Sequence, residues 1–159
     1  MEEEIKMNSF TSLGLGSELT SALAEQGYET PTPIQIAAIP KALAGHDLLA
    51  AAQTGTGKTA AFMLPSLERL KRYATPSTSP AMHPVRMLVL TPTRELADQV
   101  EQNTQNYIKN LPLRHTVLFG GMNMDTQTQA LRAGCEIVVA TVGRLLDHIK
   151  QKNINLSKV

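Results

Sequence analysis

The sequence predicts an α/β fold in which a parallel sheet carries helices on both faces. Short apolar runs alternate with longer segments of helical periodicity, and such alternation is typical of βαβ units. Size agrees with this prediction, because 159 residues of which 42% are hydrophobic are enough for one domain with its own core.

The first part of the chain is predicted to hold helices, one strand and a loop. Apolar residues recur at helical spacing within 17–26 and again within 33–44, so both segments are expected to be helices. The apolar run Asp47–Ala52 is expected to be a strand. A loop rich in Gly and Thr follows it, and a helix is expected from Lys58 to Tyr73.

The second part of the chain repeats the alternation of strand and helix. It begins after residues 74–84, a stretch rich in Pro, Ser and Thr that is expected to be a surface loop. Strands are expected at 86–90, 116–119 and 136–140, and helices at 94–109, 123–132 and 143–151.

Composition excludes several classes of protein. The single cysteine, Cys135, rules out an internal disulfide framework and fits a reducing compartment, so a cytoplasmic location is expected. No apolar run approaches the ~18 residues that span a bilayer, so no membrane partner is expected. The net charge of +1 does not by itself indicate a partner. The four histidines show no metal-ligand spacing and are expected to be surface or packing residues.

The most informative motif is a phosphate loop between the predicted strand and the helix that begins at Lys58. Its residues are Ala52, Gln53, Thr54, Gly55, Thr56, Gly57, Lys58 and Thr59. Small residues let backbone N–H groups wrap a phosphate chain, and the helix N-terminus favours the anion. A Gly-rich turn with a capping threonine is the alternative, but the Gly-Lys-Thr triplet between strand and helix favours a nucleoside triphosphate site.

A second motif, Thr32-Pro33-Ile34-Gln35, allows two compatible interpretations. Locally it is a helix start, with Thr32 as N-cap, Pro33 at the first helical position and Gln35 completing a capping box. A glutamine amide also matches the donor and acceptor of the adenine N6/N7 edge. Tyr28 could add a stacking face.

Together these motifs resemble those of the DEAD-box RNA helicases, and the likeness covers nearly the whole chain. Gly27–Gln35 is similar to that family's adenine-recognising Q motif, and Phe10 stands where the family has an isolated upstream aromatic. Ala52–Thr59 is similar to motif I. Pro92–Leu96, Gly120-Gly121 and Thr141–Arg144 are similar to motif Ia, the glycine doublet and motif Ib. The sequence as a whole is most similar to the bacterial, RhlE-type branch of the family.

The resemblance implies a P-loop NTPase of RecA-like fold that uses ATP and Mg²⁺ and binds RNA. It implies that Gln35, Phe10 and Tyr28 contact adenine, and that the loop Ala52–Thr59 holds the phosphates. Lys58 and Thr59 would be the catalytic residues, with Thr59 also holding Mg²⁺. The residues implied to bind the RNA backbone are Pro92, Thr93, Arg94, Gly120, Gly121, Thr141, Gly143 and Arg144.

The chain departs from the family pattern in two ways. Val142 replaces the usual proline of motif Ib, which could loosen the loop but leaves the hydroxyl of Thr141 and the charge of Arg144 in place. No acidic residue ends an apolar strand, where one would hold Mg²⁺ and position water. The family's DEAD tetrapeptide would be expected just beyond Val159, so we expect a C-terminally truncated domain without the second RecA-like domain.

The predicted function is therefore that of the N-terminal part of an ATP-dependent RNA helicase. Residues 1–26 would form an extension with the first helix, and residues 27–159 a partial ATP-binding domain. In the full-length protein, hydrolysis would drive local unwinding of a duplex, whereas these residues alone would bind without hydrolysing. The alternatives are a non-catalytic adenine-nucleotide or nucleic-acid binding module and a DNA-directed P-loop translocase.

Overall fold

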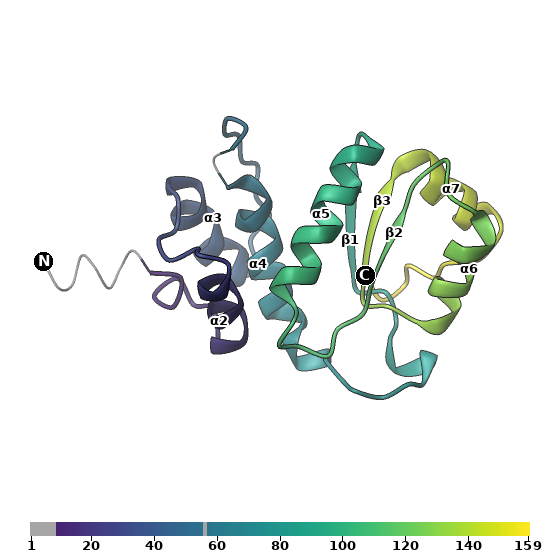
Figure 1. The fold of residues 1–159 in the computed structure, drawn as a ribbon, viewed down its shortest axis with the longest axis horizontal. Coiled ribbons are helices and arrows are strands. Elements are labelled where there is room, and N and C mark those ends of the chain that lie inside the picture. Colours follow the sequence, from purple (N-terminus) through teal and green to yellow (C-terminus); the bar gives the residue numbers. More distant parts are fainter. Residues whose placement is uncertain (1–8, 56) are drawn as a thin grey trace, which may run out of the picture. The chain divides into compact units, whose positions relative to one another are not determined.

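The computed structural model describes residues 9–55 and 57–159. The chain divides into two compact units (Figure 1), which are described separately. The first unit consists of residues 1–72 and 107–111, and the second of residues 73–106 and 112–159.

The first unit is helical. It contains α2 (Ser17–Glu25), α3 (Pro33–Leu43) and α4 (Lys58–Leu70), and the last two pack on one another. A 3₁₀ turn, η1 (Lys71–Tyr73), follows α4. Apolar side chains at helical spacing face the interior, and the largest of those that are fully buried are Leu19, Leu23, Ile39, Met63, Leu64 and Leu67. These helices confirm the predicted ones to within a few residues.

The second unit contains a parallel three-stranded sheet in the order β1-β3-β2. Its strands are β1 (Met87–Thr91), β2 (His115–Leu118) and β3 (Ile137–Thr141). The central strand β3 is an unbroken apolar run, fully buried from Ile137 to Ala140, as expected for a strand between two neighbours.

Helices α5 (Arg94–Tyr107), α6 (Met124–Ala133) and α7 (Val142–Lys150) complete the alternation with the strands. In Figure 1, α5 lies on one side of the strands, and α6 and α7 lie on the other. One core cluster joins Val138 and Ala140 of β3 to Leu145 of α7. These elements confirm the predicted α/β class.

The predicted strand Asp47–Ala52 is wrong. This segment has no regular secondary structure, and the side chain of Leu49 is completely exposed. A strand exists only when its backbone N–H and C=O groups pair with a neighbouring strand. Among the described residues, the sheet contains only β1, β2 and β3, all in the other unit, so an apolar run alone was not sufficient.

The loop at 74–84 contains a 3₁₀ turn, η2 (Pro80–Met82). A buried histidine of this loop, His83, contacts the loop itself and the rest of the second unit. His83 Nδ1 lies 2.5 Å from Glu136 Oε1, and both side chains are fully buried. His83 Nε2 lies 2.6 Å from the carbonyl oxygen of Ser77, and Glu136 Oε2 accepts the backbone N–H of Arg114 at 3.0 Å. His83 is therefore a packing residue, one of the two roles expected for the histidines.

The helices of the described structure were compared with what a bilayer-spanning helix requires. Over residues 9–55 and 57–159, every helix is too short or too polar to span a bilayer.

Candidate nucleotide and nucleic-acid interface

The phosphate loop leads directly into a helix, as predicted. Gly55 and Gly57 have φ angles of 83° and 85°, in the left-handed region that glycine adopts without strain. Helix α4 begins at Lys58, and N–H groups in its first turn point out of the helix end. Thr56 lies outside the described residues. This arrangement can bind an anion through backbone donors and the positive end of the helix dipole.

The side chains of the loop are accessible. Gln53, Thr54, Gly55 and Lys58 are exposed, and Ala52 and Thr59 are half-buried. A ligand can therefore reach both the Lys58 ammonium group and the Thr59 hydroxyl. The segment ahead of the loop has no regular secondary structure, so the loop is attached to a regular element at its α4 end.

Gln35 joins the second motif to the phosphate loop. Its Oε1 accepts the backbone N–H of Thr32 at 3.0 Å, and its Nε2 donates to the carbonyl oxygen of Gly57 at 3.2 Å. Helix α3 starts with Pro33 at its first position and a capping box between Thr32 and Gln35, so the helix-start interpretation is confirmed. A side chain at Gly57 would collide with the Gln35 amide, so glycine is required there for this contact.

The aromatic residues predicted beside adenine line a common groove in the first unit. Its volume is about 370 Å³, and its walls include Phe10, Tyr28, Ala24 and Glu29. The ring of Phe10 is buried, whereas Tyr28 is 56% exposed and offers a stacking face. Gln35 is not part of this lining. The structure thus brings Phe10 and Tyr28 together and places Gln35 at the phosphate loop instead.

The residues predicted to bind RNA meet at one end of the sheet in the second unit. Strands β1 and β3 pair in parallel with Thr91 opposite Thr141, and β2 pairs with β3 with Leu118 opposite Ala140. The segments that follow each strand therefore emerge side by side at the carboxyl ends, where open α/β sheets bind ligands. This juxtaposition is what the sequence predicted.

Arg94, on the first turn of α5, lies over the glycine turn. Its guanidinium carbon is 5.1 Å from the centre of the Phe119 ring. Gly121 has a φ of 87°, and a Cβ there would lie 2.9 Å from Arg94 Nη1. Thr93 caps the same helix, because its Oγ1 accepts the N–H of Leu96 at 3.2 Å. Arg94 is exposed, so its charge remains accessible beside the turn.

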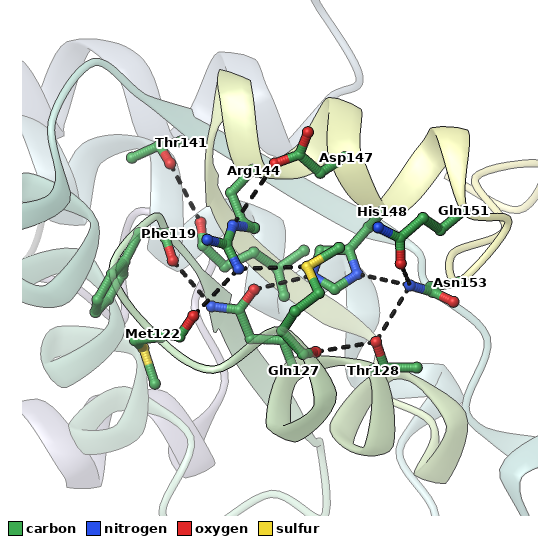
Figure 2. A network of polar contacts seen from close by, with 12 residues as sticks. Phe119, Met122, Gln127, Thr128, Thr141, Arg144, Asp147, His148, Gln151 and Asn153 are labelled. Atoms are coloured by element: carbon green, nitrogen blue, oxygen red, sulfur yellow. Dashed lines mark hydrogen bonds and ion pairs between the residues drawn. The ribbon is translucent and has the colours of Figure 1, made fainter.

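Arg144 contacts the residue that follows the glycine turn (Figure 2). Its Nη1 donates to the carbonyl oxygen of Met122 at 3.2 Å, and its Nε lies 3.8 Å from Asp147 Oδ2. The Arg144 side chain is only 16% exposed. Helix α7 begins at Val142, so valine in place of the family's proline still permits the helix start.

Two buried polar residues beside this turn were not predicted as functional. Gln127 of α6 is 2% exposed, and His148 of α7 is fully buried. Gln127 Nε2 donates to the carbonyl oxygen of Phe119 at 3.0 Å, and His148 Nε2 lies 2.8 Å from Gln127 Oε1. The sequence offered one weak signal that Gln127 is buried. Gln127 lies four positions before Leu131 and therefore shares a face of α6 with this apolar residue.

The His148 imidazole is kept neutral. Burial, assisted by the Arg144 cation, holds the pKa of His148 below its ordinary value, while Asp147 opposes the shift. Since the neutral ring has one N–H, its two nitrogens have different roles. Nε2 can donate to Gln127, and Nδ1 can accept from Asn153 Nδ2 at 3.1 Å.

Metal ligation by clustered side chains is not a feature of the described residues. Within 9–55 and 57–159, no three His, Cys, Asp or Glu side chains are grouped so that they could hold a metal ion. The Thr59 hydroxyl, at the start of α4, is a hard oxygen donor of the kind that Mg²⁺ accepts.

The chain combines a parallel sheet of α/β connectivity with a phosphate-loop motif ahead of α4. These features define a P-loop NTPase of RecA-like fold. The chain belongs to the DEAD/DEAH box helicase family, whose profile matches residues 32–159.

Individual relatives agree with this assignment. The chain is 47% identical over 153 residues to "Probable ATP-dependent RNA helicase ddx42" of Dictyostelium discoideum, covering 96% of the chain and 15% of the relative. It is 46% identical over 152 residues to "ATP-dependent RNA helicase DeaD" of Escherichia coli K12, covering 95% and 23%. The chain thus spans less than a quarter of the length of these relatives.

A solved structure shows the same fold. The crystal structure of a DEAD box protein from the hyperthermophile Methanococcus jannaschii superposes with a TM-score of 0.82 at 35% identity. The match covers 96% of the chain and 39% of that protein.

Proposed function

We propose that this chain is the N-terminal ATP- and RNA-binding part of an ATP-dependent RNA helicase of the cytoplasm. Residues 1–26 form its extension and first helix, and residues 27–159 its partial ATP-binding domain. The observation that carries the proposal is the hydrogen bond from Gln35 to Gly57, because it joins the segment proposed to recognise adenine to the loop proposed to hold phosphates. In the full-length protein, hydrolysis drives local unwinding of an RNA duplex.

ATP phosphates bind to the backbone of Ala52–Thr59, with the N-terminal turn of α4 supplying donors and a favourable dipole. Lys58 reaches the β- and γ-phosphates from an exposed position. The Thr59 hydroxyl holds Mg²⁺, which when bound neutralises charge on the phosphates. The three described strands end at Thr91, Leu118 and Thr141, none of them an acidic residue that could position water, so the chain by itself is expected to bind ATP without hydrolysing it.

Adenine recognition by Gln35 is compatible with the contacts that Gln35 already makes. An amide nitrogen has two N–H donors and an amide oxygen has two lone pairs. Gly57 uses one donor and Thr32 uses one lone pair, which leaves one of each for the N6/N7 edge of adenine. Phe10 and Tyr28 supply aromatic surface in the groove that they line.

Gln35→Ala in the full-length protein is expected to reduce the preference for ATP over GTP by about tenfold. The physical reason is the loss of a two-point amide contact, which is worth ~1–3 kcal/mol of discrimination. Competition between the two nucleotides in an ATPase or binding assay measures it. Gln105→Ala, at an exposed position of α5, is the matched control. Unchanged discrimination in Gln35→Ala would remove Gln35 from this role.

RNA binds through its backbone to the carboxyl edge of the sheet. The edge offers the guanidinium groups of Arg94 and Arg144, hydroxyl groups of Thr93 and Thr141, and the backbone of the exposed turn Gly120-Gly121. Pro92 and Gly143 shape the two helix starts beside them. Such groups contact phosphate and sugar, which gives binding with little choice of sequence.

Arg144→Ala is expected to weaken single-stranded RNA binding and to flatten its salt dependence. Each phosphate contact that is lost lowers the slope of log affinity against log salt concentration by ~0.7. Titration at several salt concentrations measures the slope, with Arg132→Ala at an exposed position of α6 as control. If Arg144→Ala has the wild-type slope, the Arg144 guanidinium makes only contacts within the protein and does not bind RNA phosphate.

A non-catalytic nucleotide- or nucleic-acid-binding module is the second candidate. It is favoured by the ends of the three described strands, where no acidic residue stands. The full-length protein discriminates between the candidates: RNA-stimulated release of phosphate from ATP supports the helicase. Binding of both ligands without turnover supports the module, and stimulation by DNA alone supports a DNA translocase.

A further inference from the structure

A chain of polar contacts runs beneath the turn at Gly120-Gly121 (Figure 2). Asn153 Nδ2 donates to His148 Nδ1 at 3.1 Å. His148 Nε2 donates to Gln127 Oε1 at 2.8 Å, and Gln127 Nε2 donates to the Phe119 carbonyl oxygen at 3.0 Å. We call these contacts, from Asn153 to Phe119, the polar relay.

The direction of each hydrogen bond in the polar relay is fixed. A carbonyl oxygen can only accept, so Gln127 must turn its NH₂ group toward Phe119 and its oxygen toward His148. That oxygen needs a donor, which places the single proton of the His148 ring on Nε2. His148 Nδ1 is then the acceptor that Asn153 requires. Because burial lowers the pKa of His148, the ring is neutral, as this pattern demands.

The polar relay ends on the peptide that enters the glycine turn. In a trans peptide the C=O and the next N–H point in opposite directions. Because the Phe119 C=O points toward Gln127, the Gly120 N–H points away from Gln127. Gly120 is an exposed residue. The far side of the turn is fixed as well, because Arg144 donates to the Met122 carbonyl oxygen.

Packing alone does not account for these residue types. Apolar side chains of similar size would fill the space between α6 and α7 without the cost of burying an amide and an imidazole. The buried polar atoms of Gln127 and His148 are instead all engaged, and the series ends on a backbone carbonyl beside the predicted RNA-binding glycines.

We propose that Gln127 and His148 are positioning residues that orient the Phe119–Gly120 peptide, so that the Gly120 N–H presents itself to an RNA phosphate. This inference rests on the proposed RNA-binding function of the same turn. Neither side chain contacts RNA directly. Their effect on binding is transmitted through the backbone of the turn.

The test is Gln127→Met in the full-length protein, because methionine keeps the shape of glutamine but loses both hydrogen bonds. Binding of a single-stranded RNA homopolymer is expected to weaken about tenfold, and its log–log salt slope to fall by ~0.7, one phosphate contact. Affinity for an ATP analogue, bound in the other unit, is expected to stay unchanged. Gln129→Met, the same substitution at an exposed position of α6, is the control and is expected to resemble wild type.

Different results overturn different claims. If Arg144→Ala weakens RNA binding but a folded Gln127→Met has wild-type affinity and slope, the positioning role is refuted while the RNA surface stands. If neither variant changes RNA binding, the RNA surface is refuted together with the positioning role.

A second pair of measurements applies even if Gln127→Met does not fold. Asn153→Ala, at the half-buried end of the polar relay, is expected to weaken RNA binding about threefold. Nitrogen chemical shifts in the wild-type protein are expected to show His148 protonated at Nε2 alone at neutral pH. Protonation at Nδ1 instead, or an Asn153→Ala variant with wild-type RNA affinity, would overturn the proposal.

Discussion

Lys58→Ala is expected to abolish ATP hydrolysis by the full-length protein, with a fall in turnover of at least about a hundredfold. Lys58 is an exposed cation at the first position of α4, next to the loop whose backbone receives the phosphates. Alanine there removes the positive charge that would meet the β- and γ-phosphates but leaves the helix start intact. Steady-state release of phosphate at saturating RNA measures the effect.

Lys41→Ala provides the matched control for this experiment. Lys41 is also an exposed lysine on a helix of the first unit, in the last turn of α3, and its replacement is expected to leave turnover unchanged. A Lys58→Ala variant with normal turnover would remove the phosphate loop from its assigned role. Calorimetry with Mg²⁺ and an ATP analogue would then be expected to show binding elsewhere or no binding.

Glu136→Ala is expected to lower the free energy of unfolding by about 3–5 kcal/mol, which is the cost of leaving one member of a buried pair alone. Glu136 accepts hydrogen bonds from the Arg114 backbone and contacts His83, with no exposure to water. Both neighbours of the His83 ring, Glu136 and the Ser77 carbonyl, are acceptors in their ordinary forms. The single variant leaves Nδ1 of the buried His83 ring without this partner. Urea denaturation measures the change.

A double-mutant cycle separates the pair from its surroundings. His83→Ala and Glu136→Ala are combined, and the loss in the double variant is expected to be smaller than the sum of the single losses because the two side chains touch. Glu95→Ala, at an exposed position of α5, is expected to cost less than about 0.5 kcal/mol. Additive losses, or a cost below about 1 kcal/mol for Glu136→Ala, would show that the buried contact contributes little.

Most of the fold could be predicted because its signals are local in the sequence. The helices α2, α3 and α4 follow from apolar spacing over a few turns, and the start of α3 follows from Thr32, Pro33 and Gln35. The three strands that formed are apolar runs that also have neighbours. The segment Asp47–Ala52 is also an apolar run, but among the described residues it has no neighbouring strand to pair with, and it is not a strand.

The candidate site was predictable for a similar reason, and only to the same extent. The Gly-Lys-Thr triplet is contiguous in sequence and leads directly into α4. The residues after β1, β2 and β3 lie at one edge of the sheet because these strands are parallel. Glutamine and histidine occur on many helices without special roles. Nothing near Gln127 or His148 in the sequence indicates that each would be buried against the other.

The sequence by itself determined which segments are helical, where the phosphate loop lies, and which residues follow the strands. Only the tertiary structure decided which hydrogen-bonding groups meet. Three contacting pairs are far apart in the sequence. Gln35 and Gly57 are separated by 22 positions, Gln127 and His148 by 21, and His83 and Glu136 by 53. The physical reason is that helix periodicity and capping depend on residues within a few positions of one another. The pairing of strands and the satisfaction of buried polar atoms depend on groups that only the folded chain brings together.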